Sequence, residues 1–192
     1  MSPPAQQVVV GYDFSSTGYV ALQRALALGV RAPFHVLHFV CVVDRHGPLP
    51  AVAPSGPVDY AYTEKVQAAL TDTVTQELRA IDLDRAVHFC VHVRIGKPVE
   101  ELLDVARSVG ADLILVGSKG LTGVERLVLG SVSERLVREA RCTVEVVRPK
   151  GYEDVALAKI VDHEPHLTYV PPHRYSYEDK RLEKRPSEWP LY

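Results

Sequence analysis

The chain reads Leu113-Ile-Leu-Val-Gly-Ser-Lys-Gly120 and then, after nine further residues, Gly130-Ser131. The apolar run 113–116 is typical of a buried parallel strand, and the segment 131–140 carries apolar residues at helical spacing. The glycines therefore lie between a strand and a helix.

This pairing of glycine turns with a helix start predicts a phosphate-binding loop. Glycine permits positive φ and leaves backbone N–H groups open to an anion, and the free N–H groups of a helix start favour phosphate. We expect the backbone near Gly117, Gly120 and Gly130, with the Ser131 hydroxyl, to hold the phosphates and ribose of a nucleotide. Each feature alone also fits an ordinary turn or an N-cap at Ser131, and the spacing matches neither the P-loop nor the dinucleotide fingerprint.

Strand-like and helix-like segments alternate over the first 150 residues. The expected strands are 8–10, 34–43, 87–95, 113–116 and 143–147, and the expected helices are 20–29, 63–81, 98–109 and 131–140. Strict alternation of apolar and polar residues in the third strand indicates an edge position, and Gly29 and Gly110 are expected to end their helices. Five strands separated by helices predict an α/β protein with a doubly wound parallel sheet.

Composition and charge narrow the class of protein. The 192 residues are 46% hydrophobic and 24% charged, which is ordinary for a soluble protein. The longest apolar stretches are far shorter than the roughly 20 residues of a spanning helix, and residues 1–7 lack the blocks of a signal peptide, so we expect a cytoplasmic protein. A formal net charge of −2 gives no general attraction to nucleic acid.

The cysteines and histidines form no recognisable ligand set. Cys41, Cys90 and Cys142 lie in or beside apolar strand segments without a C-x-x-C pair, so we expect small, reduced core residues and no zinc site. His88 and His92 lie on one face of the third strand, either as a surface pair or as separate neutral side chains. No protein metal site is predicted, apart from a contact of Asp13 with magnesium carried by a bound nucleotide.

The glycine spacing resembles the universal stress protein family, whose motif G-x2-G-x9-G-[ST] is filled by Gly117, Gly120, Gly130 and Ser131. The resemblance extends back to the segment 8–15 and covers roughly residues 6–149. It implies a universal stress protein domain at 1–150, a strand order of 3-2-1-4-5 with helices on both faces, and an adenine nucleotide alpha hydrolase-like fold. Within the family, this motif marks the members that bind ATP.

In such a sheet a ligand lies at the carboxyl ends of the strands where the winding reverses, which brings Asp13 beside the glycine loop. By resemblance, Asp13 contacts adenine or ribose; alternatively, it caps the helix that starts near Ser16. Val116 and Phe39 are expected to line the base pocket. The expected nucleotide contacts are Tyr12, Asp13, Phe39, Val116, Gly117, Ser118, Lys119, Gly120, Gly130, Ser131, Val132 and Ser133.

The roles of two positively charged side chains, and of two regions outside the motif, are not decided by the sequence. Lys119 and Arg126 either supply charge to a phosphate or remain solvated. The loop 51–61 is expected to be a mobile loop near the nucleotide crevice, with a lid as its candidate role. The extension 151–192 either docks loosely on its own domain or recruits a protein partner. Its candidate anchors are Tyr169, Tyr175, Tyr177 and Trp189.

The last strand departs from the family pattern. Thr143 replaces a proline, and Glu145 interrupts the apolar residues, either to guard the strand edge or because it lies on a solvent face. The resemblance implies a homodimer through this strand.

No activated nucleophile or base accompanies the glycine loop. The leading hypothesis is therefore an ATP-binding regulator or sensor in stress response, in which catalysis would be incidental. The alternatives are a slow ATPase or autophosphorylating phosphotransferase, and an interaction module that works through its tail without nucleotide.

Overall fold

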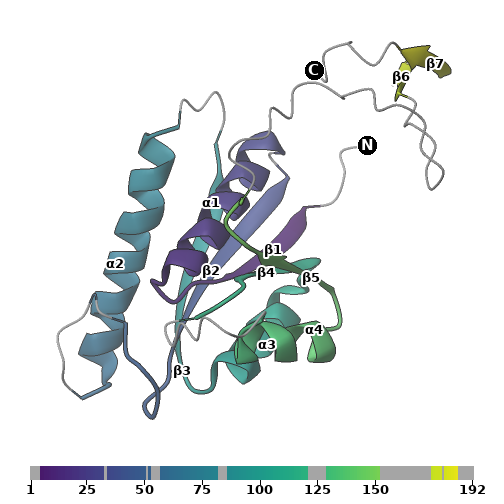
Figure 1. The fold of residues 1–192 in the computed structure, drawn as a ribbon. Coiled ribbons are helices and arrows are strands. Elements are labelled where there is room, and N and C mark those ends of the chain that lie inside the picture. The colour runs from purple at the N-terminus through teal and green to yellow at the C-terminus, as the bar shows by residue number, and fades with distance from the viewer. Residues whose placement is uncertain are drawn as a thin grey trace. The chain divides into compact units, whose positions relative to one another are not determined.

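A parallel sheet of five strands forms the centre of the computed structural model (Figure 1). The strand order is β3-β2-β1-β4-β5, so the predicted order 3-2-1-4-5 and the edge position of the third strand are confirmed. The strands are β1 (Gln6–Gly11), β2 (His35–Val43), β3 (His88–Ile95), β4 (Leu113–Gly117) and β5 (Thr143–Val147).

The structure describes residues 5–32, 34–50, 52, 57–81, 86–120, 129–151, 174–178 and 180–185. The chain divides into two compact units, Met1–Pro149 and Lys150–Tyr192, which are described separately. None of the described helices is long and apolar enough to cross a membrane.

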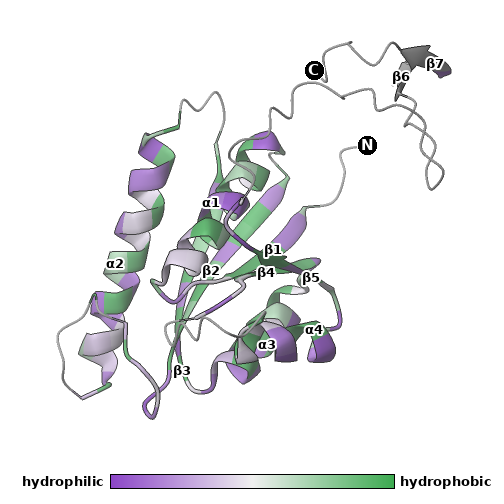
Figure 2. Ribbon diagram, in the orientation of Figure 1, coloured by the Kyte–Doolittle hydropathy of each residue, from purple (hydrophilic) through white to green (hydrophobic). Residues whose placement is uncertain are grey.

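Two helices cover each face of the sheet (Figure 1). Helices α1 (Ser16–Arg31) and α2 (Tyr60–Arg79) pack on one face, and α3 (Pro98–Val109) and α4 (Ser131–Glu139) pack on the other. Apolar residues follow the inner strands, whereas the outer surfaces of the helices are polar (Figure 2). Burial on both faces explains why β1 and β4 read as nearly continuous apolar runs.

Of the two glycines predicted to end helices, one does and one does not. Gly110 ends α3 in the left-handed conformation, with φ of 64°, as predicted. Gly29 does not end α1, which continues to Arg31. A Cβ on Gly29 would lie 3.1 Å from both Leu37 and Val87, so this glycine allows a close approach between the helix and the sheet.

The three cysteines are free, but their surroundings differ. Cys41 is a core residue as predicted, and burial raises the pKa of its thiol to about 12. Cys142 is half-buried. Cys90 is exposed on the edge strand, so its prediction as a core residue was wrong.

Glu145 lies on the side of β5 that faces α1. Its Oε1 atom accepts a hydrogen bond from Arg24 Nε at 2.7 Å, and both side chains are half-buried. The polar residue in the last strand therefore has a partner on the neighbouring helix, which the sequence alone did not identify.

The second unit contains an antiparallel hairpin of β6 (Arg174–Glu178) and β7 (Arg181–Arg185), paired from Arg174↔Arg185 to Glu178↔Arg181. Lys180, directly before β7, has a left-handed φ of 63°. The candidate anchors Tyr175 and Tyr177 lie on β6, whereas Tyr169 and Trp189 lie outside the described residues.

Candidate functional site

A cavity of about 200 Å³ opens at the carboxyl ends of the central strands. Parallel pairing aligns Gly11 of β1 with Val116 of β4, so the segments that follow these strands meet although about a hundred residues separate them. The cavity is lined by Gly11, Tyr12, Asp13, Gly18, Val40, Val42, Asp44, Pro48, Pro98, Leu102, Val116, Gly117, Lys119, Gly120, Gly130, Ser131, Val132 and Ser133.

Asp13 connects the start of α1 to the glycine loop. Its Oδ1 atom accepts hydrogen bonds from the Ser15 backbone N–H at 3.0 Å and from the Ser15 hydroxyl at 2.5 Å. Ser15 is the N-cap, because its Oγ accepts a hydrogen bond from Gly18 N at 3.1 Å. Asp13 therefore holds the N-cap residue Ser15 in place and is not itself the N-cap. Its Oδ2 would lie 3.1 Å from a Cβ on Gly120.

Thr17 joins the first turn of α1 to the loop. Its hydroxyl donates a hydrogen bond to the Lys119 carbonyl and accepts one from the Lys119 N–H at 3.3 Å. A Cβ on Gly117 would lie 2.6 Å from the carbonyl carbon and oxygen of Thr17. The backbone of the loop thus packs directly on the backbone of the helix, and only glycine fits at position 117.

The predicted reason for the motif glycines was wrong in one respect. Among the described glycines, positive φ occurs only at Gly96 and Gly110. Gly130 has φ of −74° and ψ of 155°, which any residue adopts. Close approach, and not positive φ, is therefore the property for which Gly117 is required.

The N-terminus of α4 opens on the cavity without a side-chain cap. Gly130 is the N-cap, and no side chain at that position accepts from the first turn. Ser131 is exposed at the first helical position. Ser133 is buried, and its hydroxyl donates to the Gly130 carbonyl at 2.9 Å. The helix start therefore offers N–H groups and the Ser131 hydroxyl, whereas the Ser133 hydroxyl already has an acceptor.

Ser118 lies on the buried side of the glycine loop. It is 4% exposed and is not one of the residues that line the cavity. Its backbone carbonyl accepts a hydrogen bond from Gly130 N at 2.8 Å. Of the predicted contacts, Ser118 thus joins the two halves of the glycine motif by its backbone.

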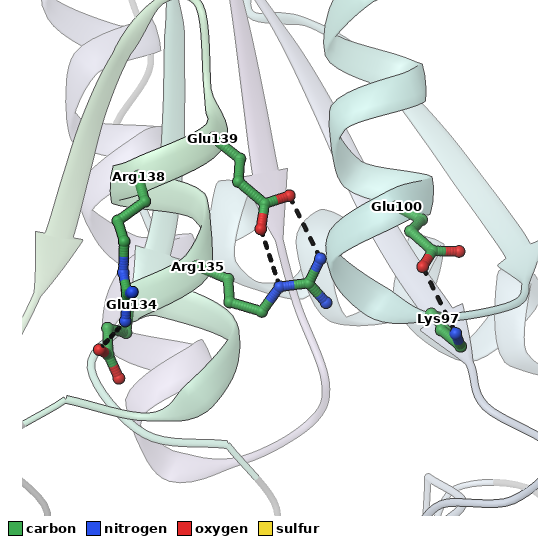
Figure 3. A network of polar contacts seen from close by, with 6 residues as sticks. All are labelled: Lys97, Glu100, Glu134, Arg135, Arg138 and Glu139. Atoms are coloured by element: carbon green, nitrogen blue, oxygen red, sulfur yellow. Dashed lines mark hydrogen bonds and ion pairs between the residues drawn. The ribbon is translucent and has the colours of Figure 1, made fainter.

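The exposed side of α4 carries ion pairs one helical turn apart (Figure 3). Arg135 donates to Glu139 with 2.9 Å between Nε and Oε1, and Arg138 pairs with Glu134. A third pair, Lys97 with Glu100, lies at the start of α3 with 3.6 Å between Nζ and Oε1. Exposed pairs of this kind contribute little stability.

The predicted base-pocket residue on β2 was wrong. Phe39 is fully buried in the core on the α1 and α2 face, with its ring edge to face with Phe89. Val40 and Val42 line the cavity instead. Neighbouring strand residues point to opposite faces, so a difference of one position moves the side chain to the other side of the sheet.

The residues after β1 show local strain and burial. Phe14 has a left-handed φ of 62°, which is unusual for a bulky residue, and strained residues of this kind cluster at functional sites. Its ring packs edge to face on Tyr12 at 4.7 Å. Burial raises the pKa of Tyr12 to about 12, so its phenol is neutral at physiological pH.

The sequence did not predict the roles of Thr17, Gly18, Val40, Val42 and Asp44 at this site. Gly18 and Thr17 had a possible signal, because they lie in the first turn of a helix that follows the strand with Asp13. The candidate cation Arg126 lies outside the described residues, as do positions 51 and 53–56 of the predicted lid. The last two residues of that predicted loop, Tyr60 and Ala61, belong to α2.

We expect Thr17→Val to lower the free energy of unfolding by about 1–2 kcal/mol, because it leaves the N–H and carbonyl of Lys119 without their partner. Thr17→Ser keeps the hydroxyl and should lose much less. Urea denaturation of both variants measures the difference. Equal stability of Thr17→Val and the unmodified chain would contradict the role of this contact.

Comparisons with known proteins agree with this architecture. The model of the universal stress protein family matches residues 4–148. A universal stress protein of Methanocaldococcus jannaschii is 47% identical over 145 residues, which span 74% of this chain and 82% of the relative. A universal stress protein of Synechocystis is 25% identical over 150 residues, which span 74% of this chain and 97% of the relative.

Solved structures share the fold at lower identity. The universal stress protein UspA from Lactobacillus plantarum has a TM-score of 0.59 at 22% identity, and the match covers 77% of this chain and all of that protein. The sheet order, the glycine motif and the matched family model lead to one assignment. The chain belongs to the universal stress protein family.

Proposed function

We propose that the chain binds an adenine nucleotide, with ATP as the first candidate, and acts as a nucleotide-responsive regulator in stress response. The observation that carries the proposal is the uncapped N-terminus of α4 beside the Gly117–Gly120 loop at the cavity. Backbone N–H groups and the helix dipole at this point suit phosphate oxygens.

The lining divides into a polar and an apolar part, as a nucleotide requires. Gly130, Ser131 and the positive side chain of Lys119 suit the phosphates, while Val40, Val42 and other apolar side chains offer a surface for a base. Asp13 lies on the side of the cavity formed by β1 and is our candidate for a ribose or adenine contact.

Two structural relatives support the class of ligand. One is a universal stress protein described in complex with cAMP, with a TM-score of 0.54 at 23% identity. Another is an Arabidopsis thaliana family member with AMP bound, with a TM-score of 0.50 at 18% identity. These proteins motivate an adenine nucleotide for this chain, and the choice of ATP rests on the complete glycine motif.

A second candidate function is slow ATP hydrolysis, and one observation favours it. Asp44, at the end of β2, lines the same cavity as Asp13, which gives the site two carboxylates that suit magnesium. In that case the Asp13→Ala variant would lose a magnesium-dependent turnover.

We expect purified protein to carry an adenine nucleotide that mass spectrometry identifies after denaturation. The Gly130→Asp variant should weaken ATP binding by roughly 100-fold or more, because its carboxylate would compete for the N–H groups of the helix start. A Cβ at Gly130 meets no atom closer than 3.4 Å, so the variant should fold.

Gly151→Asp is the matched control, because a Cβ there meets nothing within 4 Å. Bound ATP supports a regulator that holds its ligand, whereas ADP favours the hydrolytic alternative. If titrated ATP fails to bind the unmodified chain, the proposal is wrong.

The proposal includes a homodimer that pairs along the β5 edge. Strand β5 is an outer strand of the sheet, and the Arg24–Glu145 pair keeps the charge of Glu145 on the α1 side. Light scattering on the purified chain should give twice the monomer mass, and a monomer mass would contradict this part.

A further inference from the structure

Three potential metal ligands gather where β2 meets β3, on the sheet face of α3 and α4. Ligand atoms from His38, Cys90 and His92 all lie within 4.8 Å of one another. The sequence predicted no ligand set among the histidines and cysteines, and it placed His92 on one face with His88, either as a surface pair or as separate neutral side chains. His38 comes from the neighbouring strand, which that prediction did not consider.

The parallel register creates the group. His38 of β2 lies opposite Cys90 of β3, and Val40 lies opposite His92. Cys90 and His92 are two residues apart on β3 and therefore share a face with His38. No spacing within one segment reveals such a set.

The two imidazoles already have the separation of ligands to one ion. His38 Nδ1 lies 3.1 Å from His92 Nε2. Two nitrogens bound tetrahedrally to zinc at their usual bond lengths lie roughly 3.3 Å apart. Cys90 is exposed, so a rotation of its side chain can bring Sγ to bonding distance without disturbing the core.

Gln7 contacts the second ring nitrogen of His38. Its Oε1 atom lies 2.8 Å from His38 Nε2. This contact favours the tautomer with its proton on Nε2, which turns the lone pair of Nδ1 toward His92. An outer partner of this kind orients metal-binding histidines in known sites. Burial also lowers the pKa of His38 and His92, which favours neutral rings.

The group combines a buried side with an accessible side. His38 is only 7% exposed, whereas Cys90 on the edge strand β3 is open to solvent. The nearby Arg94 is paired with Asp104 of α3 at 3.5 Å, which offsets its charge. A cation can therefore reach the group from solvent.

We propose that His38, Cys90 and His92 form a binding site for a divalent transition metal, with zinc as the first candidate and water as a fourth ligand. Two imidazoles and a thiolate are the ligand types that zinc prefers, and calcium and magnesium require oxygen ligands instead. None of these three residues lines the nucleotide cavity, although Val40, which does, lies opposite His92.

The test uses the untagged chain of 192 residues without nucleotide. It is titrated with zinc in competition with a chromophoric chelator. We expect one zinc per chain, and cobalt in its place should give a thiolate-to-metal charge-transfer band. Cys90→Ser should remove this band and weaken zinc binding by roughly 100-fold or more, and Gln7→Ala should weaken it by about 10–100-fold.

Two controls separate the site from adventitious binding. Cys142→Ser and His35→Gln remove the same ligand types elsewhere and should leave the affinity unchanged. Zinc should also slow the alkylation of Cys90 but not of Cys142, as measured on peptides by mass spectrometry. If Cys90→Ser binds zinc as tightly as the unmodified chain, or if neither metal binds, the proposal is wrong. The rings of His38 and His92 then only form a hydrogen bond with each other.

Discussion

Gly117→Ala is expected to lower the free energy of unfolding by about 1–3 kcal/mol and to remove ATP binding in the variant that still folds. The new Cβ would lie 2.6 Å from the carbonyl carbon and oxygen of Thr17. Backbone atoms cannot turn aside as a flexible side chain can, so the loop must move away from α1. That movement breaks the contact of Thr17 with Lys119 and displaces the loop from the cavity.

Gly130→Ala is the matched control for this prediction. Its Cβ would meet no atom closer than 3.4 Å, which is ordinary van der Waals contact. Chemical denaturation and ATP titration of both variants should therefore separate the two glycines. Equal losses of stability would contradict the close approach at position 117.

Phe39→Ala is expected to cause the largest loss of stability, about 3–5 kcal/mol, because it empties a fully buried position. The ATP affinity of the folded protein should change little, since Phe39 lies on the opposite face of β2 from Val40 and Val42. Phe39→Leu should also lower stability while leaving ATP affinity nearly unchanged, but with a smaller loss of stability. This variant therefore permits the binding measurement at moderate temperature.

Val42→Phe tests the other face of the same strand. Val42 is half-buried and lines the cavity, so a larger ring should fill space that a base would occupy. We expect weaker ATP binding with a small change in unfolding free energy. A strong effect of Phe39→Leu on affinity, with none from Val42→Phe, would reverse the assignment of the two faces.

The sequence predicted the elements of the first 150 residues well. Periodicity located all five strands and four helices, and the 98–109 helix and the 143–147 strand match the structure at both ends. The order of the strands came from the family resemblance, because periodicity describes each element alone and does not determine its neighbours.

The faces of β2 could not be predicted, for a physical reason. Both of its sides are buried by helices, so its run 36–43 is almost uniformly apolar and gives no inward or outward signal. Phe39 and Val40 are equally plausible pocket residues under those conditions. β3 alternates strictly, and its predicted edge position is correct.

Contacts between distant segments also escaped the sequence analysis. The Thr17–Lys119 hydrogen bonds join residues 102 positions apart. The His38–His92 contact depends on the register of two strands 54 residues apart. Such pairs follow from topology and register together, which a single sequence without an alignment does not supply.

The central position of β1 has a consequence during synthesis of the chain. A nascent chain that ends after β3 can already pair β1 with β2 and β2 with β3, but the other edge of β1 stays open until Leu113–Gly117 is translated. The open edge presents unpaired backbone N–H and C=O groups on a strand whose residues 8–10 are all valine. An open apolar strand of this kind favours association with other chains. The second half of the polypeptide therefore covers this open edge in the same step that assembles the crevice.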